Sequence, residues 1–323
     1  MKTKITVLLL VLCLFPACTT LQTISFERLQ AADVSYPDQV RTVGVINYAP
    51  LDKQERDSIL GLWNGDGMVT VESLAREIAA TDYFNQVVVC DSALRPVGMG
   101  NEEILPMSQA DSLIQALGVD MLFAVEQVRI ELKEGSLFHT ELMMDVPAVD
   151  GVITPLVRAY VSGRNAPLFS ISKTDTICWV VSPELTFGQI MQEASDFAAT
   201  LPVSYLLPHW KEMNRYYFDG GNMEMRDAGV YIREQNWEGA VALWQKLHDG
   251  RKGKVKMRAA YNLALNYELQ GDYERAKEYL DTALSLASEG SWEHQLIEYY
   301  RLQLDEQARE NRMLQIQMKR FEP

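Results

Sequence analysis

The chain has 323 residues, with 44 acidic against 30 basic side chains and a formal net charge of −14. Its length predicts about two domains, and 47% hydrophobic with 23% charged residues is typical of a globular protein rather than a disordered one. The acidic balance argues against nucleic acid as a partner, because binding phosphates requires a basic stripe. Four cysteines exclude a disulfide-rich scaffold and a cysteine-based zinc array.

The first eighteen residues predict export and lipidation. A positive region, Met1–Lys4, precedes the apolar run Ile5–Phe15, which is shorter than the roughly 20 residues of a membrane-spanning helix and fits a signal-peptide core. Leu14-Phe15-Pro16-Ala17-Cys18 resembles a bacterial lipoprotein box, which implies removal of residues 1–17 and a lipid anchor on Cys18. The alternative is an ordinary secretory signal with an incidental cysteine. Thr20, in place of an acidic residue, favours the outer membrane and leaves the leaflet open.

Two cysteines remain in the body of the protein once Cys13 leaves with the signal. Cys90 and Cys178 both lie in apolar, strand-like runs. They are expected either to pair in an oxidising periplasm or to stay free and buried, where a thiol behaves as a small apolar group.

Residues 18–39 are polar and are interpreted as a tether to an α/β domain over 40–218. The domain opens with alternating patterns: a strand over 40–48, a helix over 71–84, a strand over 86–91, a helix over 108–117 and a strand over 119–132. Ser108 and Asp111 fit a capping box at the start of the second helix, and Gly118 suits its end.

Strand patterns then follow one another without helices. Segments near 136–147, 152–162 and 168–181 predict three antiparallel strands. Residues 185–218 predict a helix broken around Pro202 and Pro208. This order of elements resembles the α/β domain of envelope lipoproteins of the curli-secretion and penicillin-binding-protein-activator types, in topology alone.

An internal repeat follows from about residue 222. Five positions recur after 36 residues: Ala228, Tyr231, Trp237, Ala240 and Trp244 become Ala264, Tyr267, Tyr273, Ala276 and Leu280. Leu263, Gly271 and Ala283 complete the second copy, which resembles the tetratricopeptide repeat of about 34 residues. The resemblance implies two helix pairs, over about 222–252 and 257–290. A capping helix is expected over about 292–321, because stacked repeats need a terminal cap.

The same resemblance implies a groove on the inner face of the first helix of each pair. Its positions fall on Met225, Ile232, Arg258, Tyr261, Leu265 and Glu268. Met225 and Gly229 stand where carboxylate-binding grooves of the family carry lysine and asparagine, so a peptide C-terminus is not the implied ligand. A mixed apolar groove suits a peptide segment. The alternative is that the repeats only brace the α/β domain or mediate self-association.

The whole arrangement resembles an uncharacterised Bacteroidota lipoprotein family. The lipoprotein box, a first strand such as Val43-Gly44-Val45-Ile46-Asn47 and the C-terminal repeats carry this resemblance. It implies an α+β fold: an α/β domain with a mixed sheet, then an all-α repeat domain over 219–323.

Motifs for catalysis are not found in the sequence. The four histidines form no HExxH or HxxxH pair, and no nucleophile elbow, phosphate-binding loop or dinucleotide fingerprint occurs. We therefore expect no cofactor, no metal and no enzymatic activity. The expected function is a lipid-anchored scaffold that binds an envelope protein or peptide. The alternatives are an envelope hydrolase, with a cleft in residues 40–215 that holds convergent carboxylates or His139, and a structural subunit of a secretion assembly.

Overall fold

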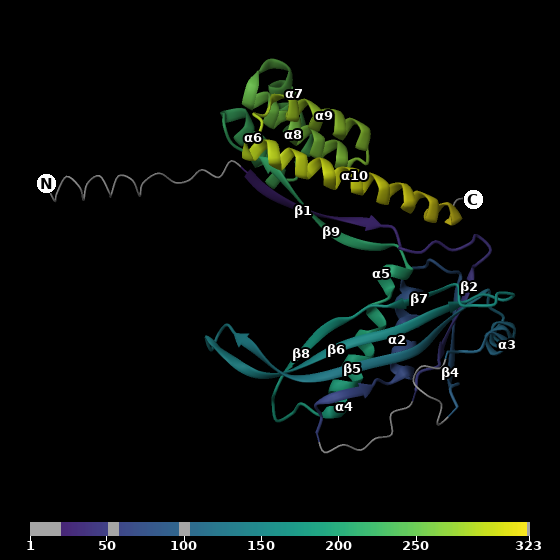
Figure 1. Cartoon of the computed structure of the whole chain (residues 1–323). Helices are drawn as coiled ribbons and strands as arrows, with labels where there is room; N and C mark the ends of the chain where they lie inside the picture. Colours follow the sequence, from purple (N-terminus) through teal and green to yellow (C-terminus); the bar gives the residue numbers. More distant parts are fainter. Residues whose placement is uncertain (1–20, 51–57, 97–103, 322–323) are drawn as a thin grey trace. The chain divides into compact units, whose positions relative to one another are not determined.

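A computed structural model describes residues 21–50, 58–96 and 104–321 (Figure 1). The chain divides into two compact units, each discontinuous in sequence. The helical unit contains the described residues up to Gln30 together with Trp210–Ile316, and the α/β unit contains Ala31–His209 together with the residues from Gln317 onwards. The predicted boundary at 218/219 therefore lies about nine residues away from the observed one at 209/210. Cys18 and the predicted signal peptide fall outside the described residues.

A mixed sheet is the framework of the α/β unit. Its strands are β2 (Thr42–Asn47), β3 (Gly61–Asn64), β4 (Gln86–Ala93), β5 (Met121–His139), β6 (Met144–Tyr160), β7 (Phe169–Ser172) and β8 (Asp175–Val180). The order is β4-β2-β5-β6-β7, with β3 paired to β5 and β8 to β6. The β4-β2 and β2-β5 pairs are parallel and the other pairs are antiparallel. The predicted mixed sheet is confirmed.

Helices cover both faces of the parallel strands. Val43 and Val45 of β2 belong to the larger apolar cluster, together with α2 (Gly67–Ala80) and α4 (Phe187–Thr200). Ile46 belongs to the smaller cluster with α3 (Met107–Leu117). This division follows from the period of two along a strand. The run Met121–Val125 in β5 has no exposed surface, as predicted for a central strand.

Local signals fix the ends of the first two helices. The Asp66 carboxylate accepts a hydrogen bond of 2.9 Å from the Met68 N–H and caps α2. Gly118, at φ = 63°, ends α3 in the left-handed conformation that glycine adopts most readily, as predicted. The predicted cap at Ser108 is wrong: Pro106 is the N-cap residue of α3, and no side chain caps this helix.

The antiparallel part of the sheet differs from the prediction. The segment 136–147 is not a separate strand but the end of one long hairpin, in which β5 runs to His139 and pairs with Met144 at the start of β6. The segment 168–181 holds two short strands, β7 and β8. The short strand β3, which pairs with β5, was not predicted, because its four residues begin with a glycine and have too little periodicity to be recognised.

The helical unit contains five helices and one two-stranded sheet among the described residues. The helices are α6 (Met223–Arg233), α7 (Trp237–Gly250), α8 (Gly253–Leu269), α9 (Tyr273–Leu286) and α10 (Trp292–Met318). The strands are β1 (Leu21–Gln30) and β9 (His209–Phe218). The predicted tether thus contains a strand, and the predicted end of the 185–218 helix is also a strand. Of the helix predicted over 185–218, the structure contains only α4 and the single turn α5 (Val203–Leu206).

The C-terminal residues are part of the α/β unit. The Gln317 amide accepts a hydrogen bond of 2.9 Å from the Ala32 N–H and donates one of 2.8 Å to the Ala32 carbonyl. The Arg320 guanidinium lies 4.4 Å from the centre of the Tyr83 ring. A truncation within α10 therefore removes contacts that the α/β unit uses.

We predict that Gly67→Ala destabilises the α/β unit. A methyl group at this position would lie 2.2 Å from the Asn47 Oδ1 atom and 2.8 Å from the Ala49 side chain, so the start of α2 must shift. The expected cost is about 1–3 kcal/mol, measured by urea unfolding. Gly188, in the first turn of α4, is the matched control, because nothing lies within 4 Å of its added methyl group. Gly188→Ala should be neutral or slightly stabilising, and equal effects of the two variants would contradict the packing described.

Candidate functional site

The residues predicted to pack the repeats lie between paired helices. Each of α6, α7, α8 and α9 has a fully buried alanine at the repeated position: Ala228, Ala240, Ala264 and Ala276. Trp244, Leu263, Leu280 and Ala283 are also buried, and Tyr231, Trp237, Tyr267 and Tyr273 are partly buried against the same cluster. Gly271, at φ = 79°, makes the turn between α8 and α9. Alanine at these positions allows the helices to approach each other closely.

The residues predicted to line a partner-binding groove are all buried. The most exposed of the six, Arg258, is 8% exposed, and Met225, Ile232, Tyr261, Leu265 and Glu268 are less exposed. The prediction that these side chains bind a partner therefore needs correction. Of the six, Arg258, Tyr261 and Glu268 contact residues of β9 or α10 in the same chain. We call the surface that the six residues form the concave face.

Glu268 of α8 is the centre of the concave face. Its carboxylate is fully buried and receives two hydrogen bonds from the Arg215 guanidinium of β9, at 2.8 and 3.1 Å. The Tyr300 hydroxyl of α10 donates a third at 2.6 Å. A forked, two-bond pairing of arginine with carboxylate fixes both orientation and distance. One acidic side chain thus joins α8 to a strand and to a helix that are distant from it in sequence.

Burial and the neighbouring charges shift the pKa values of Tyr300 and Arg215 in this cluster. Burial raises the pKa of Tyr300, and the neighbouring Glu268 carboxylate raises it further, so the phenol stays neutral and donates its proton to the hydrogen bond. Burial alone would lower the pKa of Arg215, but the hydrogen bonds and charge of Glu268 outweigh this and raise it. The Arg215 guanidinium therefore remains ionised at neutral pH.

Polar side chains of α8 also hold the end of β9. The Asn262 side chain accepts a 2.8 Å hydrogen bond from the Phe218 N–H and donates one of 2.7 Å to the Phe218 carbonyl. It thereby pairs with the strand backbone as a neighbouring strand would. The Arg258 guanidinium donates to the Gly220 carbonyl at 2.9 Å and lies 5.1 Å from the centre of the Phe218 ring.

The strand β1 also contacts the helices of this unit. The Arg28 guanidinium donates to the Glu268 carbonyl at 2.6 Å and to the Tyr273 hydroxyl. Leu21, Ile24 and Phe26 pack against the apolar cluster of the helices. β1, β9 and α10 consequently cover the concave face, where the Asn262 and Glu268 side chains find hydrogen-bond partners within the chain.

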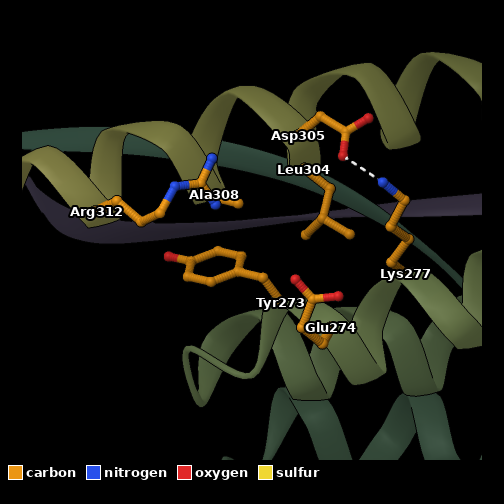
Figure 2. Close-up of a pocket in the computed structure, with 7 residues that line it drawn as sticks. All are labelled: Tyr273, Glu274, Lys277, Leu304, Asp305, Ala308 and Arg312. Carbon is orange, nitrogen blue, oxygen red and sulfur yellow. Dashed lines mark hydrogen bonds and ion pairs between the residues drawn. The ribbon is translucent and has the colours of Figure 1, made fainter.

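A small hollow of about 160 Å³ lies between α9 and α10 (Figure 2). Its lining is mostly charged or polar: Tyr273, Glu274, Lys277, Leu304, Asp305, Ala308 and Arg312. The Lys277 ammonium lies 2.9 Å from the Asp305 carboxylate, so these two charges neutralise each other. The hollow is smaller than the roughly 300–1,000 Å³ of most small-molecule sites.

Among the residues of the α/β unit whose burial is described, one acidic side chain is buried: Glu126, at a β-bulge of β5. Its carboxylate accepts hydrogen bonds from the Arg158 guanidinium, from the Tyr160 hydroxyl and, at 3.2 Å, from the Leu105 N–H. Three donors thus already satisfy this carboxylate, which anchors the bulge.

The other groups singled out in the sequence lie apart from one another. The His139 ring accepts a 3.3 Å hydrogen bond from the Leu142 N–H at the turn of the β5–β6 hairpin. Cys90 in β4 is partly buried and Cys178 in β8 is exposed, and both thiols are free. Within the described ranges, no three His, Cys, Asp or Glu residues gather as a metal site would require. No helix among them is long and apolar enough to cross a membrane.

An exposed apolar surface at the end of the β5–β6 hairpin was not predicted. We define the hairpin tip as residues 137–144, which project beyond the shorter strands of the sheet (Figure 1). Its exposed apolar side chains are Leu137, Phe138, Leu142, Met143 and Met144, and Met143 reaches 75% exposure. The sequence signal was available: five large apolar residues in eight positions, at a turn that normally carries polar residues.

We predict that Glu268→Gln destabilises the helical unit by about 3–5 kcal/mol, because it leaves the Arg215 charge buried without its counter-charge. Glu274→Gln, at an exposed position of α9, is the matched control and should change the unfolding free energy little. The unfolding free energy of both variants is measured by urea unfolding.

The double variant Arg215→Met, Glu268→Leu should lose less unfolding free energy than the sum of the losses from the two single changes. Stability of Glu268→Gln equal to that of the unaltered protein would contradict this assignment.

Comparison with known proteins adds two family matches and weak similarity to solved structures. No curated protein matches the chain. The PelC dodecamer from Paraburkholderia phytofirmans is 12% identical with a TM-score of 0.26, covering 58% of this chain and 99% of that one. The hypothetical protein CT253 from Chlamydia trachomatis is 12% identical with a TM-score of 0.24, covering 42% of this chain and 72% of that one. Likeness at this level carries no argument about function.

Two family models match separate parts of the sequence. The one described as Domain of unknown function (DUF6340) matches residues 226–306, within the helical unit. The one described as Domain of unknown function (DUF8603) matches residues 40–218, the range predicted for the α/β domain and more than half of the chain. The protein therefore belongs to the family described as Domain of unknown function (DUF8603).

Proposed function

We propose that this protein is a lipid-anchored lipoprotein of the bacterial cell envelope that acts without catalysis as a protein-binding scaffold. The lipoprotein box that ends at Cys18 supports the anchor. The helix pairs α6–α7 and α8–α9, with a buried alanine at the repeated position of each helix, support a tetratricopeptide-repeat type for the helical unit.

The observation that carries protein binding is the hairpin tip. Five large apolar side chains are exposed there, on an extension held by a long antiparallel pair. Apolar surface in water costs about 25 cal/mol per Å², so five large exposed apolar side chains within eight residues favour an interaction site. Two of the five residues are methionines, whose flexible side chains adapt to irregular surfaces.

The charges around the hairpin tip indicate the kind of surface that it binds. Glu134, Glu141 and Asp145 are exposed beside the apolar residues, with Lys133 as the nearby cation. This acidic rim disfavours an anionic lipid surface and suits an apolar pocket edged by lysine or arginine on a partner protein.

In this proposal the repeats serve an internal role. Their concave face holds β1, β9 and α10, so it acts as a brace for the chain rather than as a groove for a free peptide. The surface that binds a partner protein is instead the hairpin tip.

The anchor is tested with Cys18→Ser. We expect the unaltered protein in the membrane fraction and the variant in the soluble fraction of the envelope, because a serine hydroxyl takes no lipid at this position. Incorporation of radiolabelled palmitate provides a second readout, expected only for the unaltered protein. Equal distribution and equal labelling of the two proteins would contradict the lipid anchor.

Binding through the hairpin tip is tested by site-specific photo-crosslinking in cells. A photoreactive residue at Met143 should give a discrete protein adduct, whereas one at Met223 of α6 should not. Met223 is a suitable control because it is a methionine of similar exposure on the other unit. Phe138→Ser should abolish the adduct, and mass spectrometry identifies whether the contacted surface is basic. Crosslinking to lipid alone, or an adduct that survives Phe138→Ser, would contradict the proposal.

A further inference from the structure

The longest described helix, α10, has an exposed stripe that no other element covers in the described chain. Tyr299, Leu302, Glu306, Arg309, Met313 and Ile316 are all exposed, the four apolar ones by 41–69%. We call these six residues the α10 stripe. All of them belong to the helical unit.

The spacing of the α10 stripe is that of a coiled-coil seam. Successive members are separated by 3, 4, 3, 4 and 3 residues, which is the heptad spacing of a and d positions. The buried side of α10, with Ile297, Tyr300 and Leu304, lies on the opposite face of the helix. The helix therefore uses one face for its own unit and presents a second, regular face to solvent.

The α10 stripe is also symmetric about its own centre. Tyr299 and Ile316 lie at equal distances on either side of the midpoint between residues 307 and 308, as do Leu302 and Met313, and Glu306 and Arg309. If a second copy of the helix is laid antiparallel on the first, each member meets its counterpart. Apolar residues then meet apolar residues, and the central acid meets the central base.

We propose that α10 mediates antiparallel self-association of this protein through the α10 stripe. The occupant is a second copy because the pattern complements itself: Glu306 of each copy faces Arg309 of the other, which forms two ion pairs across the two-fold axis. A contact of this isologous type closes on itself and gives a dimer.

The flanking positions add a second set of charges. Asp305 of one copy lies within two residues of the level of Arg312 of the other, and both side chains are exposed. The Asp305 carboxylate is also paired with Lys277 of its own chain at 2.9 Å.

The dimensions of the α10 stripe indicate a modest affinity. Its 18 residues span about 26 Å at 1.5 Å per residue, and a contact of two helices over this length lies at the small end of specific interfaces. We expect a concentration-dependent monomer–dimer equilibrium rather than a permanent dimer.

The first test is charge reversal in the full chain, by sedimentation equilibrium in density-matched detergent over roughly 1–100 μM. Glu306→Arg and Arg309→Glu should each weaken dimerisation by about ten-fold or more, because each places like charges across the axis. The double variant should restore the dimer, because it exchanges the two partners. Glu278→Arg, at an exposed position of α9, is the matched control and should leave the dimer unchanged.

The second test fixes the register by disulfide formation in a Cys178→Ser background, which removes the exposed native thiol. A mixture of Leu302→Cys and Met313→Cys chains should form a crosslinked pair, whereas either variant alone should not, because only the mixed pair is adjacent in the antiparallel arrangement. A monomer at every concentration, failure of the double charge variant to restore the dimer, or crosslinking of Leu302→Cys with itself would each overturn the proposal.

Discussion

The architecture of the helical unit depends on one buried ion pair, between Arg215 of β9 and Glu268 of α8. A carboxylate in the interior is unfavourable unless charge and hydrogen bonds compensate for the lost water. Arg215 supplies the charge, and Tyr300 of α10 supplies a further donor. Because the three residues come from three separate elements, the cluster determines which strand and which helix occupy the concave face. The specificity of this arrangement comes from polar groups rather than from apolar area alone.

Because of this buried ion pair, the helical unit has the helix pairs of a peptide-binding repeat but does not have a free groove for a peptide. Paired helices of this kind leave an inner face that can hold a peptide, and here the chain itself supplies the occupant. The strand end at Phe218 is held by the side chain of Asn262 as it would be by a neighbouring strand. The surfaces free for other molecules are therefore elsewhere, at the hairpin tip of the α/β unit and along the outer stripe of α10. Both are defined by exposed apolar residues rather than by a cavity, and those of α10 follow a heptad spacing.

Much of the fold could be predicted because the signals were local. The strands around Val43 and Val87 are β-branched runs, Gly118 ends a helix by its backbone conformation, and alanines at a 36-residue interval mark the helix pairs. The misassigned segments depend on distant partners. The sequence of β9 has no continuous apolar alternation, and its strand conformation follows from pairing with β1, about 190 residues away. The residues predicted to line the groove are buried, and no local pattern reveals that β9 and α10 pack against Arg258, Tyr261 and Glu268.

The most direct test of this account is hydrogen exchange at the Phe218 N–H, in the full chain under native conditions. This group donates to the Asn262 side chain at the end of the concave face. If β9 is a permanent part of the helical unit, the amide exchanges only when the unit unfolds, with the same protection as the amides in the middle of α8. Exchange of Phe218 that is much faster than that of α8 would show that the strand leaves the face while the helices remain folded. The concave face would then be open to a partner, and the account would be contradicted.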